Sequence, residues 1–120
     1  MLEWNSIEMD QKVVCERVGT AWLAVAPNSL VAFNDSLLSS VLPINGLRHP
    51  KQVRIDGWYL WSGGEIPDHE DFFKPIHMVH LIEMKPIILK YLGLPAGWRF
   101  QIDENGYEDI WFDPTLLVID

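Results

Sequence analysis

The chain has 120 residues, 48% hydrophobic and 22% charged, so its length suits one domain and its composition favours a packed core over disorder. Its formal net charge is −8, and the acid lies mainly in the second half: residues 1–60 hold 5 basic and 6 acidic residues, whereas residues 61–120 hold 4 and 11. This balance disfavours nucleic acid and anionic membrane surfaces as partners, because both would be repelled, and it favours a basic protein partner.

The chain carries no sign of export or of a membrane span. No apolar run approaches the roughly 20 residues that cross a bilayer, and the N-terminus lacks the basic start and apolar stretch of a signal peptide. The single cysteine, Cys15, excludes an internal disulfide framework and fits a reducing cytosol. These features predict a cytoplasmic protein in which Cys15 serves as a small apolar residue on a helix.

In the first third of the chain, apolar spacing predicts a helix over residues 6–18, which Gly19 ends. Residues 20–26 are ambiguous, and residues 30–33 form a short apolar run typical of a buried strand. Residues 34–40 begin with potential capping side chains and predict a brief helical turn.

The middle of the chain is rich in turn-forming residues. Two prolines and an Asn-Gly pair predict that residues 42–50 form a loop. Residues 53–62 read as a strand that ends at Gly63-Gly64, and residues 66–74 read as an acidic loop.

Residues 75–92 are helical in character but contain Pro86. A proline inside a helix costs about 3 kcal/mol, so the pattern predicts two consecutive helices, over 76–84 and 87–92. Gly93 and Pro95 then mark a stop.

Two strands, over residues 98–103 and 108–112, are predicted to form an antiparallel hairpin around the turn 104–106. A short apolar tail over 116–119 is expected to dock on the core. No repeat, low-complexity segment or linker interrupts the sequence, so residues 1–120 are expected to form a single domain. The order of elements predicts an α+β fold with a small, mainly antiparallel sheet and helices packed on one face.

Eleven of the fourteen aromatic residues lie from Gly57 onward, in short blocks beside carboxylates. Large rigid side chains next to acidic groups build either a compact core or a face that holds a basic partner. An acidic loop follows an aromatic strand, and we take residues from both as partner-binding candidates. They are Trp61, Glu65, Asp68, Glu70 and Asp71.

The histidines suggest a second possible function, a metal site. His77 and His80 are three apart on a predicted helix, with Glu83 three further on and His69 upstream, a set that resembles metal ligands. A small metal-dependent enzyme that uses them, with His49 as a further ligand, is therefore one alternative. The zinc-protease spacing is absent, so a structural role for the helical histidines is the favoured interpretation, and no metal or cofactor is expected.

Other polar groups point to surface roles. The carboxylates around the hairpin predict a solvated acidic face, and Arg99 is expected to pair across the strands with Glu108 or Asp109. For Arg48 and His49, in the proline-bounded loop, both a binding role and a packing role stay open. The chain shows neither a nucleophile elbow nor a phosphate-binding glycine loop, so we expect no enzyme. A structural domain that dimerises through its aromatic blocks is a further alternative.

Five sequence blocks occur in a fixed order along the chain. They are LPINGLRHP (Leu42–Pro50), GWYLWSGGE (Gly57–Glu65), DFFKPIHMVHL (Asp71–Leu81), KYLGLPAGWRF (Lys90–Phe100) and YEDIWFDPTLL (Tyr107–Leu117). The series resembles a family of small bacterial proteins assigned as immunity proteins of polymorphic toxin systems, the set numbered thirty-three. The resemblance covers residues 40–118 and is less clear over 1–39. It implies a cytoplasmic protein that binds a cognate toxin and blocks it by occlusion, and it carries over no catalytic residues.

Overall fold

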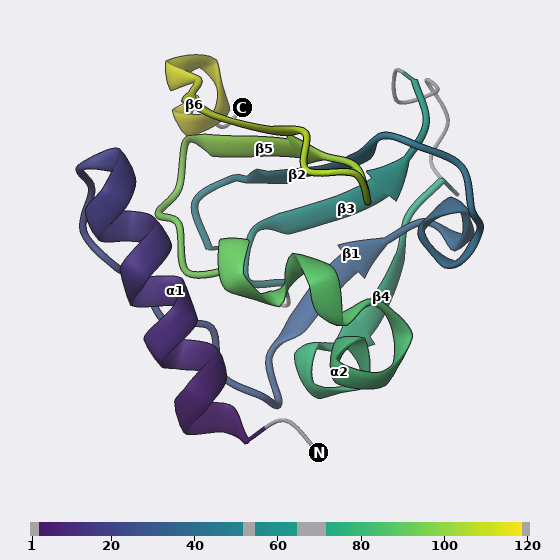
Figure 1. Cartoon of the computed structure of the whole chain (residues 1–120), viewed down its shortest axis with the longest axis horizontal. Helices are drawn as coiled ribbons and strands as arrows, with labels where there is room; N and C mark the ends of the chain where they lie inside the picture. Colours follow the sequence, from purple (N-terminus) through teal and green to yellow (C-terminus); the bar gives the residue numbers. More distant parts are fainter. Residues whose placement is uncertain (1–2, 52–54, 65–71, 119–120) are drawn as a thin grey trace.

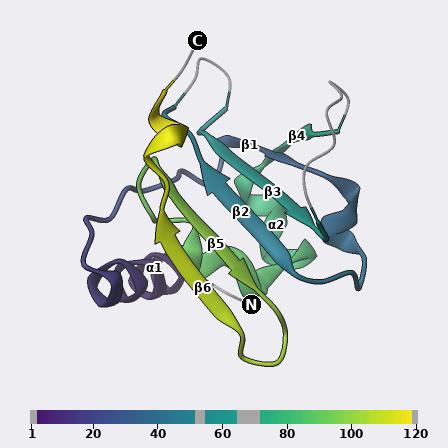
Figure 2. The same cartoon turned by 90° about the horizontal axis from the view of Figure 1, so that it is seen from above.

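The structure, a computed structural model, describes residues 3–51, 55–64 and 72–118. Its centre is a six-stranded sheet in the order β4-β1-β3-β2-β5-β6 (Figures 1 and 2). The strands are β1 (Leu30–Phe33), β2 (Ile44–Arg48), β3 (Trp58–Ser62), β4 (Lys74–His77), β5 (Trp98–Ile102) and β6 (Glu108–Phe112). Neighbours are antiparallel except β1 and β3, which are parallel. The predicted α+β class with a mainly antiparallel sheet is confirmed.

The helices pack on one face of this sheet, as Figures 1 and 2 show from two directions. Helix α1 (Trp4–Val18) begins two residues before its predicted start and ends where expected, at Gly19 in the left-handed conformation (φ 80°). A short helix, α2 (Leu81–Met84), leads into the 3-10 helix η3 (Pro86–Tyr91). None of the described helices is long and apolar enough to cross a membrane.

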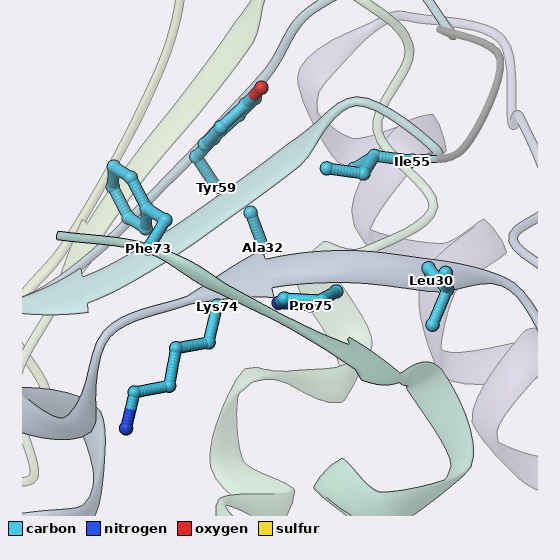
Figure 3. Close-up of a pocket in the computed structure, with 7 residues that line it drawn as sticks. All are labelled: Leu30, Ala32, Ile55, Tyr59, Phe73, Lys74 and Pro75. Atoms are coloured by element: carbon cyan, nitrogen blue, oxygen red, sulfur yellow. The ribbon is translucent and has the colours of Figure 1, made fainter. Parts of the chain in front are cut away.

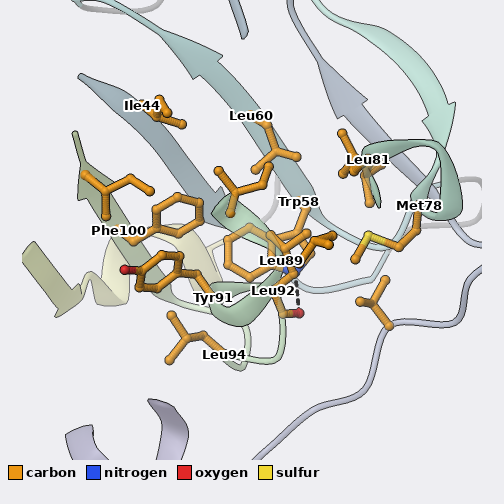
Figure 4. Packing of buried hydrophobic residues seen from close by; sticks show 14 of the residues in the cluster. Ile44, Trp58, Leu60, Met78, Leu81, Leu89, Tyr91, Leu92, Leu94 and Phe100 are labelled. Carbon is orange, nitrogen blue, oxygen red and sulfur yellow. Dashed lines mark hydrogen bonds between the residues drawn. The ribbon is translucent and has the colours of Figure 1, made fainter. Parts of the chain in front are cut away.

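The core lies between the sheet and these helices (Figure 4). Trp58 of β3 is 0% exposed, and its indole Nε1 donates to the carbonyl oxygen of Leu92 at 3.0 Å. Beside it, the rings of Tyr91 and Phe100 stack with centroids 4.9 Å apart. Burial of these aromatic side chains removes much apolar surface from water, and the bond to Leu92 satisfies the one polar atom of the indole.

Two buried polar side chains of α1 bond the helix to the core. Gln11 is 0% exposed; its Nε2 donates to the Leu89 carbonyl at 3.0 Å, and its Oε1 accepts from the Trp22 indole at 3.1 Å. Cys15 is buried and its Sγ lies 3.3 Å from the Gly93 carbonyl oxygen. Burial raises the pKa of Cys15, so the thiol stays protonated and packs as a small residue, as predicted.

The predicted loop over 42–50 is wrong, because β2 occupies most of it. Gly46 of β2 lies under the Phe100 ring, where an added Cβ would come within 2.2 Å of Phe100 Cε2. The Asn45 side chain donates to the Gly63 carbonyl at 2.9 Å and so joins neighbouring strands. The Asn-Gly pair that suggests a turn therefore serves close packing within the sheet.

The predicted helix over 76–84 is wrong at its start. Lys74–His77 is instead strand β4, which pairs antiparallel with β1, and a 3-10 turn (Met78–His80) joins it to α2. Backbone pairing with β1 outweighs the local helical pattern. The predicted break at Pro86 is confirmed, because η3 begins at that proline.

The remaining strand predictions are close to the structure. β1 has its predicted bounds, Asn34 caps the following 3-10 helix (Asp35–Leu38), and the hairpin of β5 and β6 turns at Gly106 with φ 98°. The strand predicted over 53–62 begins at Trp58, and residues 52–54 lie outside the described residues. In the predicted tail, Leu116 is buried as expected, but Leu117 and Val118 are exposed, and Ile119 lies outside the described residues.

Candidate functional site

The face of the sheet opposite α1, α2 and η3, termed here the open face, is the candidate site. Strand alternation turns Trp58 and Leu60 of β3 toward the helices and Tyr59 and Trp61 toward the open face. A second apolar cluster forms there, separate from the main core. Its members are Leu47, Trp61 and Leu116, with Tyr59, Phe72 and Phe73 packed against them.

The aromatic rings of this cluster meet edge to face. Phe73 lies at its centre, 5.1 Å from the Tyr59 ring, 6.2 Å from Trp61 and 4.8 Å from Phe72. His49 packs on the other side of Tyr59 at 5.4 Å and has its Nδ1 3.0 Å from the Leu116 carbonyl oxygen. Edge-to-face contacts fix ring orientation, so the cluster presents a preorganised surface.

A strip of polar side chains continues the open face across β2 and β5. Gln101 Nε2 donates to Asn45 Oδ1 at 2.9 Å, and the Tyr107 hydroxyl donates to Gln101 Oε1 at 2.9 Å. The chain of bonds ends at a backbone carbonyl, because Asn45 Nδ2 donates to Gly63. The strip therefore offers a partner an ordered row of amide and hydroxyl groups beside an aromatic cluster.

A hollow of about 240 Å³ opens on this face near β4 (Figure 3). Its wall is largely apolar and is formed by Leu30, Ala32, Ile55, Tyr59, Phe73, Lys74 and Pro75. In Figure 3 the Lys74 side chain extends away from Tyr59 and Phe73, and its Nζ binds Asp35 at 2.8 Å. The hollow therefore suits one apolar or aromatic side chain from a partner.

The predicted partner-binding residues fall in two places. Trp61 lies in the aromatic cluster at 3% exposure, and its Nε1 donates to the Gly64 carbonyl at 2.8 Å. The indole thus holds the backbone at the residue that precedes the acidic stretch. The four acidic candidates, Glu65, Asp68, Glu70 and Asp71, lie outside the described residues.

The histidines do not share a helical face. His77 belongs to β4 and His80 to the following 3-10 turn, with ring centroids 6.0 Å apart, while Glu83 lies on α2. His69 lies outside the described residues. Among the residues that the structure does describe, no three His, Cys, Asp or Glu side chains are grouped to hold a metal ion.

Arg48 has an interior role, and the packing alternative is the one that the structure supports. The side chain is 1% exposed, and its Nη2 pairs with Asp56 Oδ1 at 3.1 Å. Its Nη1 donates to the carbonyls of Leu23 at 2.9 Å and Leu94 at 2.8 Å. Burial lowers the pKa of Arg48, and the Asp56 carboxylate opposes that shift. Its alternation with Ile44 and Gly46, on the covered face of β2, was the available sequence signal.

The predicted partners of Arg99 are wrong. Arg99 faces Trp111 across the hairpin, so its Nη1 reaches Asp113 at 3.2 Å on the same face, not Glu108 or Asp109. The guanidinium also lies 5.3 Å from the centroid of the Trp111 ring. A Thr115 hydrogen bond, with help from Arg99, lowers the pKa of Asp113.

The Glu108 side chain lies on the opposite side of β6 from Arg99, and it connects β6 to α1 through Arg17. Arg17 donates to both of its carboxylate oxygens, at 2.7 and 3.1 Å, and the Tyr91 hydroxyl donates to it at 2.6 Å. The bonds from Arg17 hold the pKa of Glu108 below its usual range. Burial, followed by the bond to Glu108, raises the pKa of Tyr91. The cluster is a stabilising contact on the covered side.

The structure is thus an α+β domain whose open face combines an aromatic cluster, a polar strip and an apolar hollow. A family model for the Imm33-like domain matches residues 10–113, a stretch that includes all six described strands. The chain therefore belongs to the Imm33-like domain family, a family of immunity proteins, and the resemblance seen in the sequence blocks is confirmed. No curated protein and no solved structure matches the chain.

Proposed function

We propose that the chain is an immunity protein of the cytoplasm that binds a cognate toxin and neutralises it by occlusion, without catalysing a reaction. Residues 1–120 act in this proposal as one domain. The observation that carries the proposal is the open face, where an ordered aromatic cluster, a polar strip and an apolar hollow lie together in a member of the Imm33-like family. Aromatic anchors beside pockets supply most of the binding energy at protein interfaces.

The charge of the chain supports a basic toxin. A net charge of −8 creates a negative potential that accelerates encounter with a cationic protein at low ionic strength. Glu65, Asp68, Glu70 and Asp71 come after strand β3 in the sequence, and we propose that they bind basic groups of the toxin. Trp61 is buried, so we assign it the indirect role of fixing Gly64, which precedes this acidic stretch in the sequence.

The test is binding to the product of the adjacent toxin-like gene. We expect a complex at micromolar concentration or tighter in calorimetry, and loss of the toxin's activity in that complex. Tyr59→Ala, at the wall of the hollow, should weaken binding at least about tenfold. The matched control is Val13→Ala, an exposed apolar residue on the outer side of α1, which should leave binding unchanged.

A second variant tests the acidic stretch. Replacing its four proposed contact acids by their amides should slow association at low salt by about tenfold and should reduce the salt dependence of the rate. The same change at Glu8 and Glu16 of α1 serves as the control. The proposal fails if no complex forms with any neighbouring effector at micromolar concentration.

A further inference from the structure

The two edges of the sheet are unlike. β4, at one edge, has four residues, carries Lys74 and has Pro75 within it. β6, at the other edge, has five residues, contains neither lysine nor proline, and stays in unbroken register with β5 (Figure 2). Lysine and proline are the usual means by which edge strands are kept from pairing with other chains. β6 lacks both.

Hydrogen bonds at both ends of the hairpin show which backbone groups of β6 face outward. Asp113 N donates to Gly97 O at 2.6 Å, and Asp103 N donates to Tyr107 O at 3.2 Å. Hydrogen-bonded pairs alternate with non-bonded pairs along an antiparallel ladder. The odd-numbered residues of β6 therefore bond to β5.

The even-numbered residues of β6 consequently direct their backbone groups away from β5. These residues are Glu108, Ile110 and Phe112, and each carries an N–H and a carbonyl that no described strand meets. Phe112 is 46% exposed at the end of this edge. The spacing of the three residues matches the repeat that an added strand needs.

The net charge beside this edge is negative. Residues 98–113 contain a single basic residue and five acidic ones. Three of these acids pair with Arg17, Lys85 and Arg99, and within the described part of the chain Asp103 and Asp109 make no ion pair. Asp109 is exposed on β6 itself. A second copy would bring two acidic hairpins together, whereas a strand with lysine or arginine side chains would meet complementary charge.

We propose that β6 receives an extended, basic segment of the toxin by strand addition, so that the sheet continues into the partner. This proposal rests on the proposed function and specifies its binding mode. The outward backbone groups of Glu108, Ile110 and Phe112 form the new ladder. Asp109 and the hairpin carboxylates select basic side chains.

Amide hydrogen exchange, followed residue by residue with and without the product of the adjacent toxin-like gene, tests the proposal. The amides of Glu108, Ile110 and Phe112 should exchange rapidly in the free protein and at least about tenfold more slowly in the complex. Those of Asp109 and Trp111, already bonded to β5, provide the internal control. A complex that forms while the three outward amides stay rapid overturns strand addition but not the proposed function.

Two variants give an independent readout. Asp109→Lys should weaken the complex at least about tenfold, whereas Glu16→Lys on α1 should have less than about a threefold effect. Ile110→Pro removes the central outward N–H, and Ile110→Val keeps it; only the proline should abolish binding, with thermal unfolding used to verify that the fold is retained. Equal binding by Asp109→Lys and wild type overturns the proposal. So does protection of the outward amides in concentrated protein alone, which would show a second copy at this edge.

Discussion

The covered face and the open face of the sheet both contain buried polar side chains, but they satisfy them differently. On the covered face, Gln11 and Arg48 donate to backbone carbonyls. On the open face, Gln101 bonds to the side chains of Asn45 and Tyr107, and Asn45 also donates to the Gly63 carbonyl.

This difference distinguishes side chains that stabilise the fold from side chains that are available to bind a partner. A backbone carbonyl is held by secondary structure, so a side chain bonded to it is fixed and costly to remove. Bonds between side chains can be exchanged for bonds to a partner at little net cost. Substitutions on the covered face should therefore reduce stability, and those on the open face should mainly reduce binding.

The largest expected effect is at Arg48. Arg48→Met keeps the apolar stem but leaves the Asp56 carboxylate and several carbonyls without their donor, and it should lower the free energy of unfolding by about 3–5 kcal/mol. The same change at Arg17, whose side chain is 50% exposed, should cost below about 1 kcal/mol. Urea unfolding of both variants measures the two losses of unfolding free energy. Equal losses would show that the buried arginine contributes no more to stability than the exposed one.

Matched tryptophan substitutions compare the two faces directly. Trp58→Phe deletes the bond to Leu92 within the closed core and should cost about 2–3 kcal/mol, as a lost hydrogen bond plus a cavity. Trp61→Phe deletes the bond to Gly64 in the smaller cluster and should cost about 1 kcal/mol. Denaturant unfolding gives both values. A larger loss at Trp61 would contradict the assignment of stability to the covered face.

Gly46 tests how tightly β2 and β5 approach. Gly46→Ala places a methyl group against the Phe100 ring and should destabilise the fold by about 1–3 kcal/mol. Gly64→Ala is the control, because no neighbouring atom of the described residues lies within 4 Å of its added Cβ. An equal change in melting temperature in the two variants would show that the close contact with Phe100 is not the cause of the destabilisation.

The smallest effect concerns pH and the Glu108 cluster. The folded-state pKa of Glu108 is lowered, so its stabilising contribution is complete above the ordinary glutamate value of about 4.3 and is lost as the pH falls through the lower, folded value. Glu108→Gln should remove below about 1 kcal/mol at neutral pH and flatten the acid limb of the stability profile, because Arg17 is half-exposed. Urea unfolding of the variant and the wild type across pH measures the profile, and an equally steep acid limb in the two proteins would contradict this role of Glu108.

Sequence patterns predicted the elements whose local signals agree with their packing. α1, β1 and the β5–β6 hairpin are such elements. The sequence does not predict β2, because Asn45 and Gly46 together resemble a turn. In the fold, the Asn45 side chain donates a hydrogen bond to Gly63, and Gly46 leaves room for the Phe100 ring. Both uses depend on strands distant in sequence, which no local window contains.

The candidate site was predicted only in outline. The aromatic block around Tyr59 and Trp61 pointed to the right strand, but single-strand alternation does not say which face the helices cover. For Arg48, alternation with Ile44 and Gly46 indicates the covered face, but it does not identify the carbonyl acceptors, which come from residues near 23 and 94. Only the assembled fold brings those segments together.

The bonds from Arg48 have a consequence for shortening the chain. Two of the carbonyl acceptors of Arg48, those of Leu23 and Ala24, lie far before it in the chain. Deleting the first 26 residues would remove these two acceptors from a buried guanidinium and leave the Leu89 carbonyl without the Gln11 amide that bonds to it. The N-terminal quarter is thus an integral lining of the interior, and a chain without it should not fold.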